Sequence, residues 1–450
     1  MSATPSRAFN SSVDASHLET PRSTFSYGGA SSSLDDSLSS TVERVPRERA
    51  PGPASNRVRV AVRVRPPFEE EGGASAVVLV PPPGGDASAR ARALQLETSP
   101  GRAREFAFDA VFGPETSNAD VYEELAGPLV DGVMRGTNGA ILAYGQTGSG
   151  KTFSLGILTR VSGESGIIPR ALSHIFGHAE AAVEEEMRIT VSFLQVYLDG
   201  VYDLLGSVGG GGGGARAGAA GPPSLAVRED PSRGFYVEGL SEFAVSSFAE
   251  ACDVLNLGLE NRVIGETKMN ATSSRSHTLL FVRVDARAPL ALPGAAGPGG
   301  AYLLRKSQLV IADLAGSERV RRTSSRGARL AEARAINASL HTLGQVISAL
   351  SALSAAVAAG AGAHSSIHVP WRDNKLTRLL QGSVGGSSNT YLLATLTPAP
   401  ANASETLSTL LFASKCLRVS AAPAVASLRA PPPGSAAHAN YYAEVAASLA

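Results

Sequence analysis

The sequence predicts an α/β fold in which a central, mostly parallel twisted sheet is flanked by helices on both faces. Several segments are continuous apolar runs, as expected for strands that are covered on both sides. Segments with helical spacing separate some of these runs, and this alternation is typical of a sheet between two helical layers. The expected strands are residues 57–64, 140–144, 188–198, 279–284, 308–312 and 390–396.

The clearest helical pattern lies between the last two of these strands. Ile336, Leu340, Leu343, Ile347 and Leu350 follow one another at alternating steps of four and three residues, which places all five on one helix face. The overlapping run 346–363 has the length of a membrane span but consists mostly of Ala, Ser and Gly. Because it offers little strongly apolar surface, we expect a soluble helix that continues into a small-residue loop, and no membrane insertion.

Composition limits the classes of function. The chain has 450 residues, of which 40 are basic and 40 are acidic. This balance argues against a chain-wide surface for nucleic acid or another polyanion. Two cysteines, Cys252 and Cys416, cannot build a disulfide framework, and the first residues lack the apolar segment of a secretory signal. We therefore expect a protein of a reducing compartment.

One large ordered domain is expected after a disordered extension. Residues 1–56 are rich in Ser, Pro, Arg and Asp and poor in large apolar side chains, so they cannot bury enough surface to fold. Glycine- or proline-rich stretches at 81–86, 206–223 and 288–300 are interpreted as surface loops, because strand patterns resume after each. The glycine run in the second stretch lacks a following Lys-Ser/Thr and therefore does not fit a nucleotide loop.

A phosphate-binding loop follows the strand expected at 140–144. Gly145, Gly150, Lys151 and Thr152 fit the pattern G-x-x-x-x-G-K-[ST]. Small residues let backbone N–H groups close around phosphates, while Lys151 would reach the β- and γ-phosphates and the Thr152 hydroxyl would bind Mg²⁺. The alternative is a flexible glycine turn, which the preceding strand and following helix disfavour.

Two further segments become candidate parts of a nucleotide site once the phosphate-binding loop is considered with them. Asp313 follows an apolar strand, where a carboxylate can hold the Mg²⁺ shell, and the Gly316 N–H could sense the γ-phosphate. Residues 270–277, NATSSRSH, would by themselves be interpreted as a hydroxyl-rich turn or a phosphorylation patch. Together the two segments predict switch loops, in which Arg275 pairs with Glu318 and the hydroxyls of Ser273 and Ser274 meet γ-phosphate and Mg²⁺.

The chain resembles a kinesin motor domain. The segments AYGQTGSGKT, NATSSRSH, DLAGSER, INASLHTLGQVISAL and VPWRDNKLTRLLQGSVGG are similar to that family's signature segments and occur in the family's order. VRVRP near residue 61 and ETLSTLLFA near residue 405 also fit, so the resemblance covers residues 57–419. It implies a P-loop NTPase of the kinesin motor fold that binds ATP and Mg²⁺.

The resemblance also implies roles for individual residues. Arg63, Arg65 and Pro66 would line the adenine pocket, with Tyr144 adjacent. Asn270, Ser273 and Ser274 resemble the first switch; Asp313, Gly316 and Glu318 resemble the second, where Glu318 would help activate the attacking water. The nucleotide loop itself comprises Gly145, Gln146, Thr147, Gly148, Ser149, Gly150, Lys151, Thr152 and Phe153.

A filament-binding face is implied next to the second switch. Residues 331–350 resemble the helix that packs on tubulin, and Arg372, Lys375 and Arg378 resemble its basic neighbours. The alternative for these three residues is an ordinary solvated helix face. Weaker candidates for the same acidic partner are Arg228, Arg233, Arg319, Arg321, Arg322 and Arg326.

The function expected from the resemblance is a microtubule-stimulated ATPase motor of the cytoplasm and its cytoskeleton, directed to the plus end. One alternative is a microtubule-binding scaffold with weak or non-motile ATPase activity. A GTPase is disfavoured, because Asn374-Lys-Leu-Thr377 lacks the acid of a guanine-reading segment.

The segment after the motor departs from the family pattern. Residues 420–450 would hold a neck linker without the usual asparagine latch and a short helix near 441–449, too brief for a stable coiled coil. The chain as given is therefore expected to be a monomer, with a dimer possible if a longer chain supplies a stalk.

Overall fold

A computed structural model describes residues 42–43, 57–81, 91–99, 101–156, 165–206, 223–230, 234–269, 273–289, 302–318, 328–360, 367–424 and 427–430. The chain divides into units 1–40 and 41–450, and all described residues belong to the second. Outside the described residues lie the expected disordered extension (apart from residues 42–43), most of the three expected loops and the short helix near 441–449.

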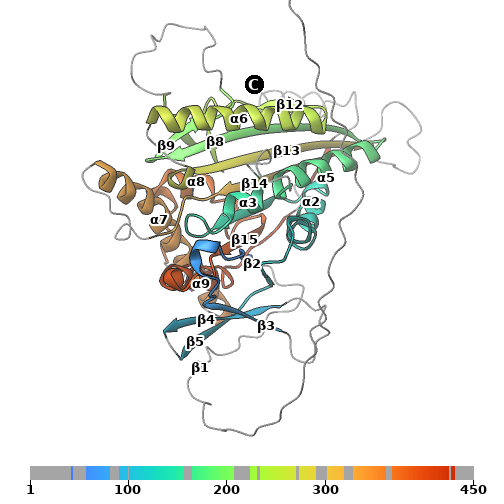
Figure 1. Cartoon of the computed structure of the whole chain (residues 1–450). Coiled ribbons are helices and arrows are strands. Elements are labelled where there is room, and N and C mark those ends of the chain that lie inside the picture. The colour runs from blue at the N-terminus through green and yellow to red at the C-terminus, as the bar shows by residue number, and fades with distance from the viewer. Residues whose placement is uncertain are drawn as a thin grey trace, which may run out of the picture. The chain divides into compact units, whose positions relative to one another are not determined.

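The expected α/β class is confirmed, with a central sheet that is mixed (Figure 1). Four neighbouring pairings are parallel, β14–β7, β7–β15, β15–β2 and β2–β6, whereas β12–β8, β8–β13 and β13–β14 are antiparallel. In spatial order the strands are β12 (Phe243–Val245), β8 (Glu186–Tyr197), β13 (His277–Pro289), β14 (Tyr302–Asp313), β7 (Gly139–Tyr144), β15 (Asn389–Leu396), β2 (Arg59–Val64) and β6 (Ala110–Phe112). Additional antiparallel partners are β9 (Gly200–Asp203) on β8 and β16 (Ser427–Ala430) on β14.

Four of the seven neighbouring pairings in this strand order are thus parallel, and the other three form an antiparallel half. A continuous apolar run indicates that both faces of a strand are covered, but it carries no information about strand direction. β14 pairs antiparallel with β13 along its whole length, from Asp313 opposite Thr278 to Tyr302 opposite Pro289. Both faces of this antiparallel half are covered as well. Its strands therefore have the continuous apolar runs that are typical of parallel sheets.

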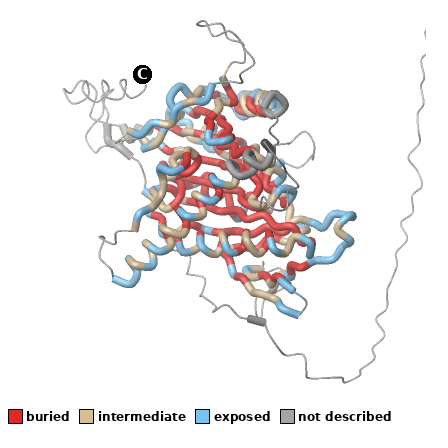
Figure 2. Tube along the Cα trace, turned by 90° about the vertical axis from the view of Figure 1, so that its left-hand side faces the viewer, coloured by how far each residue is buried: buried red, intermediate tan, exposed pale blue. Residues whose placement is uncertain are grey.

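Alternate residues of each central strand belong to different hydrophobic cores. In β7, Ile141 and Ala143 join one core, while Leu142 and Tyr144 join the other. The first core lies under α1 (Asn118–Val121), a π-helical turn (Tyr122–Ala126), α2 (Gly127–Met134), α5 (Ile167–Ala181) and α6 (Phe248–Met269). The second lies under α7 (Ala328–Ala358), α8 (Lys375–Leu379) and α9 (Ala403–Cys416). Figure 2 shows buried residues concentrated along the strands between these layers.

Smaller elements extend the second layer. One sheet has the order β1 (Val42–Glu43), β5 (Arg102–Ala107), β4 (Ala93–Ser99) and β3 (Val77–Val80), and its buried Leu94 and Leu96 join the second core. A hairpin of β10 (Val227–Asp230) and β11 (Gly234–Val237) packs beside α8. Among the described residues, 3₁₀ turns lie at Glu69–Glu71, Ser273–Arg275, Trp371–Asp373 and Pro400–Asn402.

The long helix α7 agrees with the spacing of its apolar residues. Leu340, Leu343, Ile347 and Leu350 are buried against the sheet, as the step pattern predicts. Among the described residues, the part Asn337–Ala358 is the one helix long and apolar enough to cross a membrane by length and composition. Leu340, Leu343, Ile347 and Leu350 of this helix pack in the second core, and 22% of the apolar window is buried.

Candidate functional site

The predicted phosphate loop connects β7 to α3 (Lys151–Leu155), at the C-terminal ends of the parallel strands β7 and β14. This edge of an open α/β sheet is where ligands bind. Gly150 precedes α3 with φ of 101°, a left-handed conformation that favours glycine. At Gly145, an added Cβ would lie 2.3 Å from the backbone oxygen of Thr395, so the close approach to β15 excludes any side chain.

Lys151 points into the loop. Its Nζ donates hydrogen bonds to the backbone oxygens of Gly145 at 2.8 Å and Gln146 at 2.9 Å. The side chain is buried, and burial lowers its pKa, while the charges of Asp313 and Glu318 oppose that shift. The loop therefore concentrates a cation among backbone groups, as a site for anionic phosphates requires.

Asp313 and Thr152 meet beside this cation. The Thr152 hydroxyl donates to Asp313 Oδ2 at 2.8 Å, while the buried Oδ1 has no hydrogen-bond partner among the described residues. Burial raises the pKa of Asp313, against the lowering effects of Lys151, Arg262 and the Thr152 hydrogen bond. A hydroxyl and a carboxylate with an unused buried oxygen are suitable ligands for Mg²⁺, so the residues present fit that ion.

The two predicted switch segments approach the loop and each other. The Gly316 N–H donates to the Ser274 backbone oxygen at 2.9 Å, and the Ser317 N–H donates to the Gly145 oxygen at 3.1 Å. Ser274 and Gly316 are thus brought together. Asn270 and the side chain of Ser273 lie outside what the structure describes.

The predicted pair between Arg275 and Glu318 is not formed in this structure. Both carboxylate oxygens of Glu318 instead accept hydrogen bonds from Thr147, 2.8 Å from its backbone nitrogen and 2.5 Å from its hydroxyl. The backbone bond from Ser317 to Gly145 places Glu318 alongside the loop, so Thr147 is the nearer donor. Sequence reasoning missed Thr147 as a partner because this contact depends on the conformations of two loops.

His277 joins the second switch to the long helix, a role that sequence reasoning missed. The Ala315 N–H donates to His277 Nδ1 at 3.0 Å, and His277 Nε2 lies 2.7 Å from the Ser339 hydroxyl on α7. Because Nδ1 accepts a hydrogen bond, the proton of the neutral ring is on Nε2 and is donated to Ser339. Complete burial lowers the pKa of His277 to about 3, and the charge of Lys151 contributes.

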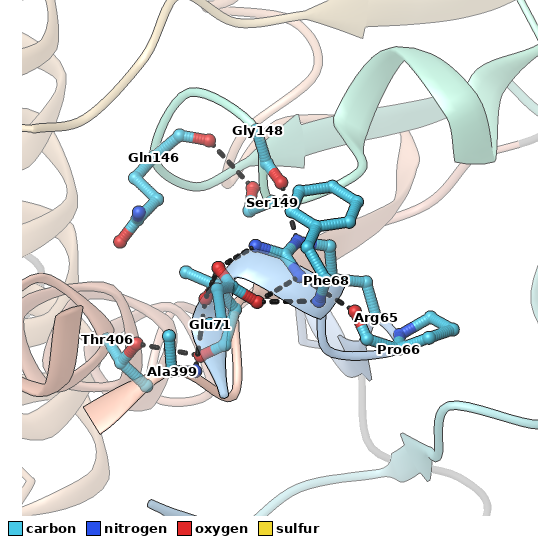
Figure 3. Close-up of polar contacts among 10 residues, drawn as sticks. Arg65, Pro66, Phe68, Glu71, Gln146, Gly148, Ser149, Ala399 and Thr406 are labelled. Carbon is cyan, nitrogen blue, oxygen red and sulfur yellow. Dashed lines mark hydrogen bonds and ion pairs between the residues drawn. The ribbon is translucent and has the colours of Figure 1, made fainter. Parts of the chain in front are cut away.

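The predicted adenine-side arginines have different surroundings. Arg65 Nε donates to the Gly148 oxygen at 2.7 Å, and its guanidinium lies over the Phe68 ring and pairs with both oxygens of Glu71 (Figure 3). That pairing lowers the pKa of Glu71 to about 2. The Pro66 oxygen accepts from Arg65 Nη1 at 2.7 Å. Phe68 and Glu71 were missed, although Glu71 is only six residues from Arg65.

Arg63 and Tyr144 are held by the fold. Arg63 is buried and donates to Asn118 Oδ1, to the Ser154 hydroxyl of α3 and to the Thr116 oxygen. The Tyr144 ring is stacked on Phe412 of α9, with ring centroids 4.0 Å apart. Arg63 thus contacts α3 directly, while Tyr144, at the end of β7 next to the loop, packs against α9.

Other loop residues fix its shape or face outward. The Ser149 hydroxyl donates to the Gln146 oxygen at 2.8 Å and lies 2.6 Å from the Thr395 hydroxyl of β15. Phe153 is exposed on α3, with the Arg63 guanidinium 5.3 Å from the centroid of its ring.

The predicted basic filament-binding residues are partly engaged. Arg372 is exposed and pairs with Glu229 of β10 at 2.8 Å. Lys375 Nζ lies 3.4 Å from the Ser224 hydroxyl, and the Arg378 guanidinium donates to the Arg372 backbone oxygen. Arg228 is exposed and paired with Glu238. Arg233, Arg319, Arg321, Arg322 and Arg326 lie outside the described residues.

Comparison with known proteins agrees with this architecture. A sequence model of the kinesin motor domain matches residues 63–419. Kinesin-like protein klp-20 of Caenorhabditis elegans is 37% identical over 367 residues, covering 81% of this chain and 51% of that protein. Kinesin-related protein 3 of Dictyostelium discoideum is 37% identical over 318 residues, covering 70% of this chain and 24% of that protein. The chain thus spans about half or less of these relatives.

Solved structures show the same fold. The structure of a fast kinesin has a TM-score of 0.67 at 32% identity, covering 83% of this chain and 94% of the other. A KIF14 dimer in the two-heads-bound state, with AMP-PNP in complex with a microtubule, has a TM-score of 0.68 at 35% identity, covering 83% and 96%.

Proposed function

The chain belongs to the kinesin family, and from that premise we propose that it is a microtubule-stimulated ATPase motor. It would couple ATP hydrolysis to movement along microtubules, with the plus end as its direction by family analogy. Its place of action would be the microtubule cytoskeleton of the cytoplasm.

One observation carries the proposal: a continuous set of hydrogen bonds runs from the phosphate loop to α7. Ser317 bonds the loop at Gly145, Ala315 bonds His277, and His277 bonds Ser339 on α7. A shift of the second switch upon loss of the terminal phosphate would therefore act directly on this helix. Because α7 would be the helix that packs on tubulin, the contacts support coupling between nucleotide state and filament binding.

The proposed chemistry assigns the loop residues to substrate and metal. Lys151 and the backbone N–H groups of the loop would hold the phosphates of ATP, and Thr152, Ser274 and Asp313 would hold Mg²⁺. When bound, Mg²⁺ neutralises charge that develops on the phosphate oxygens during transfer. Glu318 would orient the attacking water, after leaving Thr147 to pair with Arg275. Arg65 and Pro66 would lie on the adenine side.

Movement would also require that the neck, the segment from residue 420 onward, docks on the motor domain. The Ala422 N–H donates to the Gly386 oxygen at 3.0 Å, the Ala424 N–H donates to the Ser387 oxygen at 3.2 Å, and β16 continues as a partner of β14. These backbone contacts support docking without the asparagine latch of the family pattern, and they favour the motor over the non-motile scaffold.

Steady-state ATP turnover with and without microtubules tests the proposal. We expect wild-type turnover to rise with microtubule concentration and the Lys151→Ala variant to stay inactive. Gliding of polarity-marked microtubules over surface-held protein then tests motility and direction. Unstimulated turnover together with microtubule cosedimentation would favour the scaffold, and faster turnover of GTP than of ATP would contradict the nucleotide assignment.

A further inference from the structure

Two histidines and an aspartate converge on the side of the first helical layer. His174 and His178 are four residues apart on α5, so they share one helix face, and Asp131 faces them from α2. The proposed ATPase site uses none of these residues. The side chains of His174, His178 and Asp131 are 30%, 44% and 37% exposed, so the cluster is accessible from solvent.

The three ligand atoms have the spacing of a metal site. Asp131 Oδ1 lies 3.2 Å from His174 Nε2 and 3.2 Å from His178 Nε2, and all three atoms lie within 4.8 Å of one another. In a tetrahedral zinc site, ligands about 2.0 Å from the ion are separated by about 3.3 Å. Two of the three separations thus already match, and the third, between the two imidazole nitrogens, is at most 4.8 Å and would close by rotation of the exposed His178 ring.

We propose that Asp131, His174 and His178 form a binding site for a zinc-class divalent cation that joins α2 to α5. Two imidazole nitrogens and one carboxylate oxygen are ligands that Zn²⁺ accepts, and the exposed side leaves a fourth position for water. Among the described residues this is the one group of such side chains with metal-ligand spacing.

Tyr122 supports the site from behind. Its hydroxyl lies 2.8 Å from His174 Nδ1, which leaves Nε2 directed at Asp131. A histidine that binds a metal through one nitrogen commonly donates its other N–H to a fixed acceptor, which sets ring orientation and tautomer. A phenol hydroxyl can accept that hydrogen bond, so Tyr122 is placed to hold the His174 ring.

Two features oppose binding of a metal cation at this site, and the second of them makes a shared proton the alternative. The charge of Arg170, one turn earlier on α5, acts on Tyr122, although its Nε donates to the Ser165 oxygen. In addition, both imidazoles face the same carboxylate oxygen, so a proton between them would also satisfy the geometry. Binding of a metal ion can be distinguished from binding of a proton. Only the metal ion needs both histidines as ligands, and only metal binding releases protons to the solvent.

Isothermal titration of the metal-free protein with Zn²⁺, with Mg²⁺ and ADP present throughout, tests the proposal. We expect one bound equivalent in the wild type and at least roughly tenfold weaker binding in His178→Ala and in Asp131→Asn. His368→Ala is the matched control, because His368 is exposed and belongs to no such cluster among the described residues. Bound Co²⁺ should also give the visible absorption of a tetrahedral site in the wild type and the control.

The outcomes separate the two occupants. At a given concentration, Zn²⁺ should raise the melting temperature of the wild type and of His368→Ala more than that of His178→Ala, because the variant binds the ion more weakly. Equal zinc affinity in the wild type and His178→Ala, or no zinc binding at all, would overturn the proposal and leave a proton-bridged cluster. His178 is the most exposed of the three, so its alanine variant should fold without metal, and its melting temperature in chelator checks this.

Discussion

At the scale of single residues, Gly316 shows how little space separates the second switch from the phosphate loop. A Cβ added there would lie 2.3 Å from Glu318 Oε2 and 2.4 Å from the Thr147 hydroxyl. Gly316→Ala should therefore displace Glu318 and slow microtubule-stimulated ATP turnover by roughly a hundredfold, the usual effect of misplacing one transition-state contact. Gly177→Ala on α5, where an added Cβ meets nothing within 4 Å, is the matched control for turnover.

Glu318 itself gives a second prediction at this scale. Glu318→Ala removes the proposed water-orienting carboxylate but leaves Lys151 and Thr152 in place, so ATP should still bind while hydrolysis falls roughly 10²- to 10⁴-fold. Fluorescent nucleotide binding and single-turnover hydrolysis measure the two effects separately. Glu184→Ala, at an exposed acid distant in sequence, is the control. Near-normal hydrolysis by Glu318→Ala would refute the role.

At the scale of elements, His277 fastens β13 to α7 as a neutral ring. Its pKa of about 3 lies below the 6.5 of an ordinary histidine, so the unfolded chain binds the proton more tightly than the folded chain. The neutral ring stabilises the fold fully above pH 6.5, and this contribution is lost as the pH falls from 6.5 toward 3. The expected loss is about 1.4 kcal/mol per pH unit.

The variant His277→Asn isolates this contribution. The asparagine side-chain oxygen can still accept from the Ala315 N–H, but the residue does not titrate. Urea unfolding between pH 7 and pH 4 should show wild-type stability falling more steeply than that of the variant, so that their difference narrows as the pH is lowered. Parallel pH profiles would indicate that His277 is not the acid-sensitive contact.

Element by element, the sequence predicts what depends on local patterns and misses what depends on long-range geometry. β7 and β15 were expected within one residue of their observed starts, because buried runs with clear ends define them. Strand direction in β13 and β14 was missed, since burial on both faces looks the same in either direction. The contact of Glu318 with Thr147 was missed for a related reason: loop contacts depend on backbone paths that residue types do not reveal.

At the scale of the whole molecule, the phosphate loop, α7 and the neck would have to act together for the proposed movement. β14 connects two of them directly: its C-terminal end carries Asp313 beside the loop, and its N-terminal part pairs with β16. The neck contacts are mostly backbone hydrogen bonds, with Ala422 and Ala424 as donors. Backbone pairing of this kind has no residue signature, which explains why these contacts could not be predicted from the sequence.

Ala422→Pro tests whether this backbone pairing transmits force. Proline removes the N–H that donates to the Gly386 oxygen, and a lost backbone hydrogen bond of this kind costs about 1–3 kcal/mol when its acceptor stays unpaired. The neck should then dock poorly, so microtubule gliding should slow sharply while microtubule-stimulated ATP turnover stays close to wild type, because the phosphate loop is untouched. Ala422→Ser keeps the N–H and should glide like wild type. If microtubules glide over Ala422→Pro at wild-type speed, the neck pairing does not drive movement. If gliding speed and ATP turnover fall together, the substitution also disturbs the nucleotide site through β14.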